Sequence, residues 1–331
     1  MSEAVRGLFS VGSPQTIVTI ALFAIGLALI IKGGDVFVDA ATWMAEASGI
    51  PKFIIGATIV SVATTLPELL VSLIAAAEGG ADGADMAIGN AVGSVTANTG
   101  LIMGVSLIFM PLVIKRSQIA FKGILMIFAV SMLWLLCANG ALSIWEAIII
   151  LLICVVFVVE NLVAGAKDKS IEERPEVTKK LLTVNILKFV LGAAALALGS
   201  NLLVDNGEYL AVNILHVPVR IVAITLVAIG TSLPELVTAI TSLVKKQGSM
   251  SVGNIIGANI IDLTVILPLC AIVSGGTLHV APASVRLDMP VCLAEAAIAI
   301  VPTLIFKRFH RIQGVIMVAL YIAYLIYSML M

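Results

Sequence analysis

Long apolar stretches follow one another along almost the whole chain, separated by short polar turns. Each stretch is long enough to cross the hydrocarbon core as a helix, which takes about 20 predominantly apolar residues. The alternation of apolar and polar positions that is typical of transmembrane barrel strands is absent. We therefore expect an all-α membrane protein with ten transmembrane helices, at residues 15–38, 53–78, 85–113, 119–138, 142–163, 183–206, 219–243, 250–275, 288–306 and 312–330.

One longer polar stretch, GAKDKSIEERPEVTKK at Gly165–Lys180, divides these spans into two sets of five. We expect a first five-helix repeat at residues 1–164, a cytoplasmic linker at 165–182 and a second five-helix repeat at 183–331. The linker is too short to hold a separate regulatory domain, so none is expected.

The two halves resemble each other in sequence. Residues Pro51–Leu70 and Pro218–Val237 are identical at nine of twenty aligned positions and share the core Leu-Pro-Glu-Leu. Two further pairs match, Gly89–Asn98 with Gly253–Asp262 and Gly33–Asp39 with Gly199–Asp205. Because each half has an odd number of spans, the second half must enter the bilayer from the opposite face. Such inverted repeats are typical of secondary transporters, whose substrate site lies near the midplane between the halves.

Composition agrees with a membrane protein and excludes some partners. The chain of 331 residues is 60% hydrophobic and 12% charged, with a mean hydropathy of +1.15, whereas soluble domains carry about 25% charged residues. The net charge of −1 leaves no basic face for nucleic acid. The lipid bilayer is therefore an expected partner and nucleic acid is not, and we expect the protein to function as a monomer.

Lysine and arginine positions predict the orientation, since positive charge favours the cytoplasmic side. With the N-terminus outside, 14 cations lie on the inner side and three on the outer side. The inner cations are Lys52, Lys115, Arg116, Lys122, Lys167, Lys169, Arg174, Lys179, Lys180, Lys245, Lys246, Lys307, Arg308 and Arg311; the outer ones are Arg6, Arg220 and Arg286. We expect a plasma-membrane protein with both termini extracellular or periplasmic.

Two glutamates lie well inside apolar spans, in TTLPELL and TSLPELV. An ionisable group at a helix centre costs on the order of 3 kcal/mol, so Glu68 and Glu235 need compensation. The preceding prolines, Pro67 and Pro234, should bend each span and leave carbonyls near Ala63 and Gly230 unpaired. With the neighbouring threonine and serine hydroxyls, the surroundings are all oxygen. Calcium prefers six to eight oxygens, whereas zinc or copper would prefer cysteine or histidine, so a calcium site is predicted.

The third and eighth spans add a second set of polar groups. Ser94 and Asn98 share one helix face, as do Ala258 and Asp262, because each pair is four residues apart. Buried polar atoms must find partners, so these groups indicate a site rather than packing alone. Glycines in the same runs should let the helices approach their neighbours closely; they are Gly89, Gly93, Gly253 and Gly257.

The motifs TTLPELL, GNAVGSVTAN, TSLPELV and GNIIGANIID resemble the paired α-repeats of sodium/calcium exchangers, within the calcium:cation antiporter superfamily. The resemblance implies a transporter rather than an enzyme, without cofactor or catalytic residues, which exchanges sodium for calcium by alternating access as its first and sixth helices slide. It implies that calcium binds between Glu68 and Glu235 with main-chain oxygens of Thr64 and Thr231. The residues that it implies for sodium or the central region are Ser61, Thr65, Ser94, Asn98, Ala228, Ser232 and Asp262.

Two departures from the family pattern leave the counter-ion open. Thr65 stands where the family usually has serine, which keeps the hydroxyl, and Ala258 stands where another serine is usual, which removes one ligand. The alternative is a proton/calcium exchanger in which Glu68, Glu235 and Asp262 load protons, since burial favours the neutral form of a carboxyl group. An intramembrane aspartyl protease and a cation channel fit the duplicated glutamate motifs less well.

Two further glutamates in the apolar spans have no repeat partner. These are Glu160, near the end of the fifth span, and Glu295, in the ninth. The sequence assigns neither of them a role.

Overall fold

The computed structural model describes residues 14–109, 116–167, 177–215 and 230–330, and nearly all of them are helical. Eight helices in these ranges are long and apolar enough to cross a membrane, and a bent pair, Lys52–Thr64 with Leu66–Glu78, makes up to nine. A shorter apolar helix, Leu233–Val244, falls in the expected seventh span, whose first part lies outside the described residues. The expectation of a helical membrane protein is confirmed.

The described elements follow one another with few interruptions. The α-helices are α2 (Pro14–Ser48), α3 (Lys52–Ile55), α4 (Ser61–Thr64), α5 (Leu66–Glu78), α6 (Gly80–Ala97), α7 (Gly104–Phe109), α8 (Arg116–Leu136), α9 (Ile144–Lys167), α10 (Lys179–Tyr209), α13 (Leu233–Val244), α14 (Gly248–Ile261), α15 (Leu267–Val273), α16 (Met289–Phe306) and α17 (Arg311–Leu330). The π-helical turns are η1 (Gly56–Val60), η2 (Asn98–Met103), η4 (Leu210–Ile214), η6 (Asp262–Ile266) and η7 (Ser284–Asp288), and η3 (Cys137–Asn139) is a 3₁₀ turn. The strands are β1 (Ala141–Ser143) and β2 (Thr277–His279).

Helix α2 continues to Ser48, past the expected end at residue 38. The extra segment is rich in alanine, with methionine and glutamate, all good helix formers. It stops where Gly49 takes a φ of +70°, the left-handed conformation with which many helices end. Helix α10 also differs from the expectation, since it begins at Lys179, inside the expected linker. The Thr178 hydroxyl caps this helix by accepting a hydrogen bond from Leu181 N at 3.2 Å.

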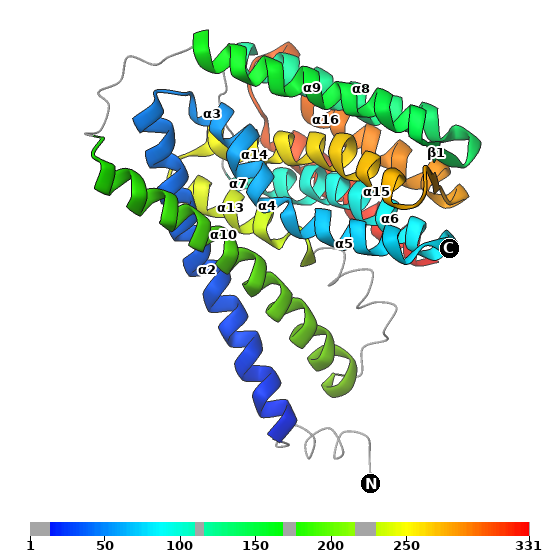
Figure 1. The fold of residues 1–331 in the computed structure, drawn as a ribbon, viewed down its shortest axis with the longest axis horizontal. Helices are drawn as coiled ribbons and strands as arrows, with labels where there is room; N and C mark the ends of the chain where they lie inside the picture. Colours follow the sequence, from blue (N-terminus) through cyan, green and yellow to red (C-terminus); the bar gives the residue numbers. More distant parts are fainter. Residues whose placement is uncertain (1–13, 110–115, 168–176, 216–229, 331) are drawn as a thin grey trace.

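Helices α2 and α10 lie side by side and extend together away from the rest of the bundle (Figure 1). They cross where glycines face each other: a methyl group on Gly26 would lie 2.9 Å from the Gly199 carbonyl oxygen. Further along, the rings of Phe37 and Phe189 stack with centroids 4.5 Å apart. The close backbone contact makes the two helices one packed unit, which rests on α13 through the second half of α2.

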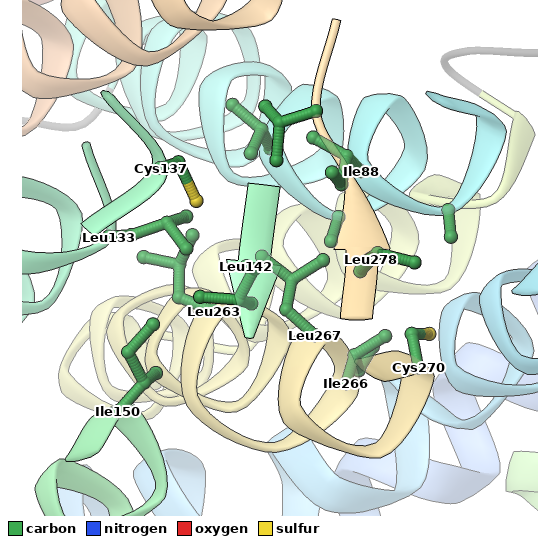
Figure 2. Close-up of a cluster of buried hydrophobic side chains, with 14 of the residues drawn as sticks. Ile88, Leu133, Cys137, Leu142, Ile150, Leu263, Ile266, Leu267, Cys270 and Leu278 are labelled. Atoms are coloured by element: carbon green, nitrogen blue, oxygen red, sulfur yellow. The ribbon is translucent and has the colours of Figure 1, made fainter. Parts of the chain in front are cut away.

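A short antiparallel sheet closes one end of the bundle. Strands β1 and β2 pair with Leu142 opposite Leu278, so the loop after α8 and the loop after α15 lie at the same end. Both leucines are buried among helix side chains that include Ile88, Leu263 and Ile266 (Figure 2). The pairing therefore ties the fourth-to-fifth and eighth-to-ninth connections to one hydrophobic core.

Candidate ion-binding site

Both proline motifs interrupt their helices. Helix α4 ends at Thr64, and α5 begins at Leu66 with Pro67 as its second residue, so the two parts are bent by 44°. In the second half, Thr231 and Ser232 form a turn before α13 begins. A proline inside a helix removes one hydrogen bond and clashes with the preceding turn, which explains both breaks. The bend that the sequence predicts in the second span is confirmed.

The carbonyl group that Pro234 frees is not left unpaired. Gly230 O, four residues before this proline, accepts a hydrogen bond of 2.6 Å from the Ser200 hydroxyl of α10. The expectation of an unpaired carbonyl at Gly230 is therefore wrong. A serine on a neighbouring helix replaces the lost amide donor, as buried backbone groups generally require. Sequence reasoning missed Ser200, although its alignment beside Gly199 placed it in a repeated motif.

The two halves exchange matching hydrogen bonds at the breaks. The Thr64 hydroxyl donates to Asn254 Oδ1 at 3.3 Å, and the Thr231 hydroxyl donates to Asn90 Oδ1, also at 3.3 Å. Each threonine thus contacts the asparagine of the other half. The same Asn90 donates its amide to the Glu68 carbonyl oxygen at 3.1 Å, so the first motif is held at the site by backbone as well as side-chain contacts.

The glutamates of the motifs are buried and lie near one another. Glu68 and Glu235 are each 1% exposed and within electrostatic range of each other. Ser232 lies beside the Glu68 carboxylate, while Thr64 and Thr65 lie beside that of Glu235. Each carboxylate therefore faces hydroxyl groups of the opposite motif. No described group donates a hydrogen bond of normal geometry to any of the four carboxylate oxygens.

The second set of polar groups joins the same region. Asp262 is 1% exposed and lies within electrostatic range of both Glu68 and Glu235. Asn98 and Asp262 are the first residues of the π-turns η2 and η6. Ser94 Oγ, both amide atoms of Asn98 and Asp262 Oδ1 are buried without a hydrogen-bond partner among the described residues. Buried polar atoms in this state call for a ligand or ion.

The sequence did not predict these π-turns. Such turns are rare inside α-helices and are frequent at functional sites. Pro268, just after η6, was the one available signal for the second turn, because proline disturbs the helical hydrogen bonds before it.

The remaining predicted residues differ in their surroundings. Ser61 O accepts the Thr65 hydroxyl at 2.6 Å and the Thr65 amide at 3.0 Å, so this carbonyl is already engaged. Ala258 is fully buried and supplies no side-chain oxygen. Ala228 lies outside the described residues.

Glycines bring α14 against the second span, as predicted for this helix. A methyl group on Gly257 would lie 2.6 Å from Ser61 Oγ and 2.5 Å from Ala57 O, and one on Gly253 would collide with Phe53 O. The backbones of α14 and η1 are therefore in direct contact. For Gly89 and Gly93, no described atom outside their own helix lies within 4 Å of the added methyl position.

A buried ion pair, Lys122 with Glu160, joins the fourth and fifth spans. Lys122 Nζ lies 2.6 Å from Glu160 Oε2, is 1% exposed, and sits 5.5 Å from the centroid of the Phe53 ring. The interpretation of Lys122 as an inner-loop cation is wrong, because it lies within α8 and is buried with a partner. The pair also accounts for Glu160, and charge matching between adjacent spans could have predicted it.

The arrangement is an oxygen-rich cluster at the breaks of two helices. Among the residues that the structure describes, no three acidic, histidine or cysteine side chains converge on one metal position. A cation held here would therefore combine two carboxylates at most with hydroxyl, amide and main-chain oxygens. Oxygen ligands of this kind suit calcium and other hard cations.

Comparison with known proteins identifies the family. The model of the sodium/calcium exchanger protein family matches residues 18–163 and 184–330. The sodium/calcium exchanger MaX1 of Methanosarcina acetivorans is 28% identical, with 93% of this chain and 98% of that protein covered. The inner membrane protein YrbG of Escherichia coli is 32% identical over 77% of this chain and 80% of its own length.

Comparison with solved structures points to the same family. The sodium-calcium exchanger NCX_Mj soaked with zero Na⁺ and Ca²⁺ superposes with a TM-score of 0.79 at 25% identity, covering 93% of this chain and 97% of the other. The same exchanger soaked with sodium and without calcium gives a TM-score of 0.78 at 27% identity over the same shares. By sequence and by fold, the chain belongs to the sodium/calcium exchanger protein family.

Proposed function

We propose that the chain is a secondary active antiporter that exchanges sodium for calcium across the membrane by alternating access. The family consists of transporters rather than enzymes, and the related NCX_Mj structures concern sodium and calcium. The observation that carries the proposal is the pair Glu68 and Glu235, which are buried near each other and accept no hydrogen bond of normal geometry from the described residues. Two uncompensated carboxylates in the membrane interior need a cation.

The architecture proposed for this function is ten helices in two inverted repeats, residues 1–164 and 183–331, joined by a cytoplasmic linker at 165–182. Three observations support it. The family model matches two stretches on either side of the linker. The Thr64–Asn254 and Thr231–Asn90 bonds are reciprocal. The β1–β2 pairing places two connections at one end, as the proposed order of spans requires.

In this proposal calcium binds between Glu68 and Glu235 and is completed by main-chain oxygens of Thr64 and Thr231. Sodium and the central region would use the remaining oxygen groups. They are the Ser61 and Ala228 carbonyls, the Thr65, Ser94 and Ser232 hydroxyls, and the side chains of Asn98 and Asp262. Each glutamate lies beside hydroxyl groups of the other motif, which supports a site built by both halves.

Alternation follows from the electrostatics of this cluster. Without an ion, several negative charges would have to pass through an occluded state in a medium of low dielectric constant, which is costly. Bound sodium or calcium neutralises them, so only the occupied carrier switches faces. The packed pair α2 and α10 is the unit that slides, since the two helices are in close backbone contact with each other and extend away from the rest of the bundle (Figure 1).

The proton/calcium exchanger remains the second candidate. Ala258, buried beside the cluster without a side-chain oxygen, favours it, because one sodium ligand is missing. We further propose a monomer in the plasma membrane with both termini outside.

The test is calcium-45 uptake into proteoliposomes with imposed sodium, potassium or proton gradients. Uptake driven by sodium alone supports the proposed exchange, whereas uptake driven by a pH gradient in sodium-free buffer supports the second candidate. Glu68→Gln and Glu235→Gln should each abolish uptake, because one of the two carboxylates is lost. Glu78→Gln, at an exposed helix end, is the matched control and should transport normally. Normal uptake by either site variant would refute the assignment.

A further inference from the structure

Another buried carboxylate lies outside the cluster, on α16. Glu295 is fully buried, with 0% of its surface exposed. Neither of its carboxylate oxygens has a hydrogen-bond partner among the described residues. The proposed exchange mechanism does not use this group, and it has no repeat partner in the sequence.

The carboxyl group fits against a glycine of the third span. A methyl group on Gly100 would lie 2.8 Å from Glu295 Oε1 and 2.9 Å from Tyr321 Cβ, so only glycine leaves room for the acid here. Gly100 belongs to η2, the π-turn that begins with Asn98. Glu295 therefore packs against the backbone of the turn whose first residue belongs to the proposed ion site.

The groups around Glu295 provide no compensating charge. The titratable groups within its electrostatic range are Tyr321 of α17 and Cys292 of its own helix. Asp262 and Asp288 lie within electrostatic range of the same Cys292, and their carboxylates would add negative charge. None of the ion pairs in the described part of the chain includes Glu295.

A charged carboxylate in this position would cost several kcal/mol, so the group must be neutralised. A metal ion would need several oxygen ligands, and no second carboxylate of the described residues lies within electrostatic range of Glu295, whereas Glu68 and Glu235 lie within range of each other. A proton needs only the carboxyl group itself. We propose that Glu295 is a proton-binding site, separate from the Glu68–Glu235 site, and that it holds its proton at neutral pH.

The bound proton keeps the Glu295 carboxyl group, and with it the contact between α16 and η2, electrically neutral. Loss of the proton would place a negative charge against the backbone at Gly100 and would separate η2 from α16, because the charged group would draw in water. The inference goes beyond the proposed ion exchange and does not depend on it.

Infrared difference spectroscopy of the full-length protein in lipid tests the inference without measuring transport. A protonated carboxylic acid has a carbonyl stretching band that a carboxylate lacks. At neutral pH, the spectrum of the wild type minus that of Glu295→Gln should contain this band. The matched control, Glu78→Gln, replaces an exposed glutamate and should leave the band in place.

If Glu295→Gln removes no such band, Glu295 is ionised and the inference fails. Should this variant not fold, Gly100→Ala gives a second measurement, because its methyl group would press on Oε1. It should shift the frequency of the same band; an unchanged protonated-acid region in Gly100→Ala would also overturn the inference. Neither measurement depends on whether sodium or protons drive calcium transport, so a failure here is distinguishable from a failure of the proposed function.

Discussion

At the scale of single residues, the most informative contact is the one from Ser200 to Gly230. It joins α10, part of the proposed sliding pair, to the break before α13. The position aligned with Ser200 in the first half is Gly34, which has no hydroxyl and instead packs against Val237. The two halves are therefore similar but not equivalent where α2 and α10 meet the proline motifs.

Replacing Ser200 with alanine should destabilise the protein by about 1 kcal/mol, because the Gly230 carbonyl loses its donor inside the membrane. Thermal unfolding in detergent measures the change. Ser131→Ala is the control: among the described residues this hydroxyl bonds only to Ile127 O of its own helix, at 2.8 Å, and its loss should cost less. Equal destabilisation by the two variants would show that the Ser200 bond has no special role.

At the scale of helices, two ion pairs made by Lys245 join α2, one helix of the proposed sliding pair, to the end of α13. Lys245, just after α13, lies 3.1 Å from Asp35 Oδ1 and 2.9 Å from Asp39 Oδ1 of α2. In the aligned positions of the other half, Glu78 takes the place of Lys245 and Asp205 that of Asp39. Two acids cannot form this bridge, so it exists at one end of the exchanger and favours the state in which α2 rests on α13.

Lys245→Met should loosen α2 from α13 without unfolding the bundle. Partly exposed ion pairs contribute about 0.2–1 kcal/mol each, so amide hydrogen exchange in the second half of α2 should rise up to about fivefold. Lys246→Met, which changes an exposed neighbouring lysine with the same charge, is the control. If amide hydrogen exchange in both variants equalled that of the wild type, the ion pairs of Lys245 would not hold α2 against α13.

At the scale of the whole molecule, ion binding and folding should be linked, because the proposed site is assembled from both halves. A ligand that binds only the folded state stabilises it by about 2.7 kcal/mol at a hundred times its dissociation constant. Calcium should therefore raise the unfolding temperature of the wild type. The shift should disappear in Glu68→Gln and in Glu235→Gln and persist in Glu78→Gln; a calcium shift that survived in both site variants would place the ion elsewhere.

Local features let the sequence predict much of this protein. Apolar length determined which segments are helical spans, because the cost of burying polar groups in lipid acts on each segment separately. Pro67 predicted the bend that separates α4 from α5. Internal alignment paired Glu68 with Glu235, which the structure places near each other.

Other features were decided only by the tertiary structure, because they depend on contacts between segments far apart in the sequence. The pairing of each glutamate with the hydroxyls of the opposite motif requires the packed halves. The same holds for the Lys122–Glu160 ion pair and for the place of Glu295 against Gly100. A sequence pattern can say that a polar group is buried, but the neighbours that neutralise it are determined by how the helices pack.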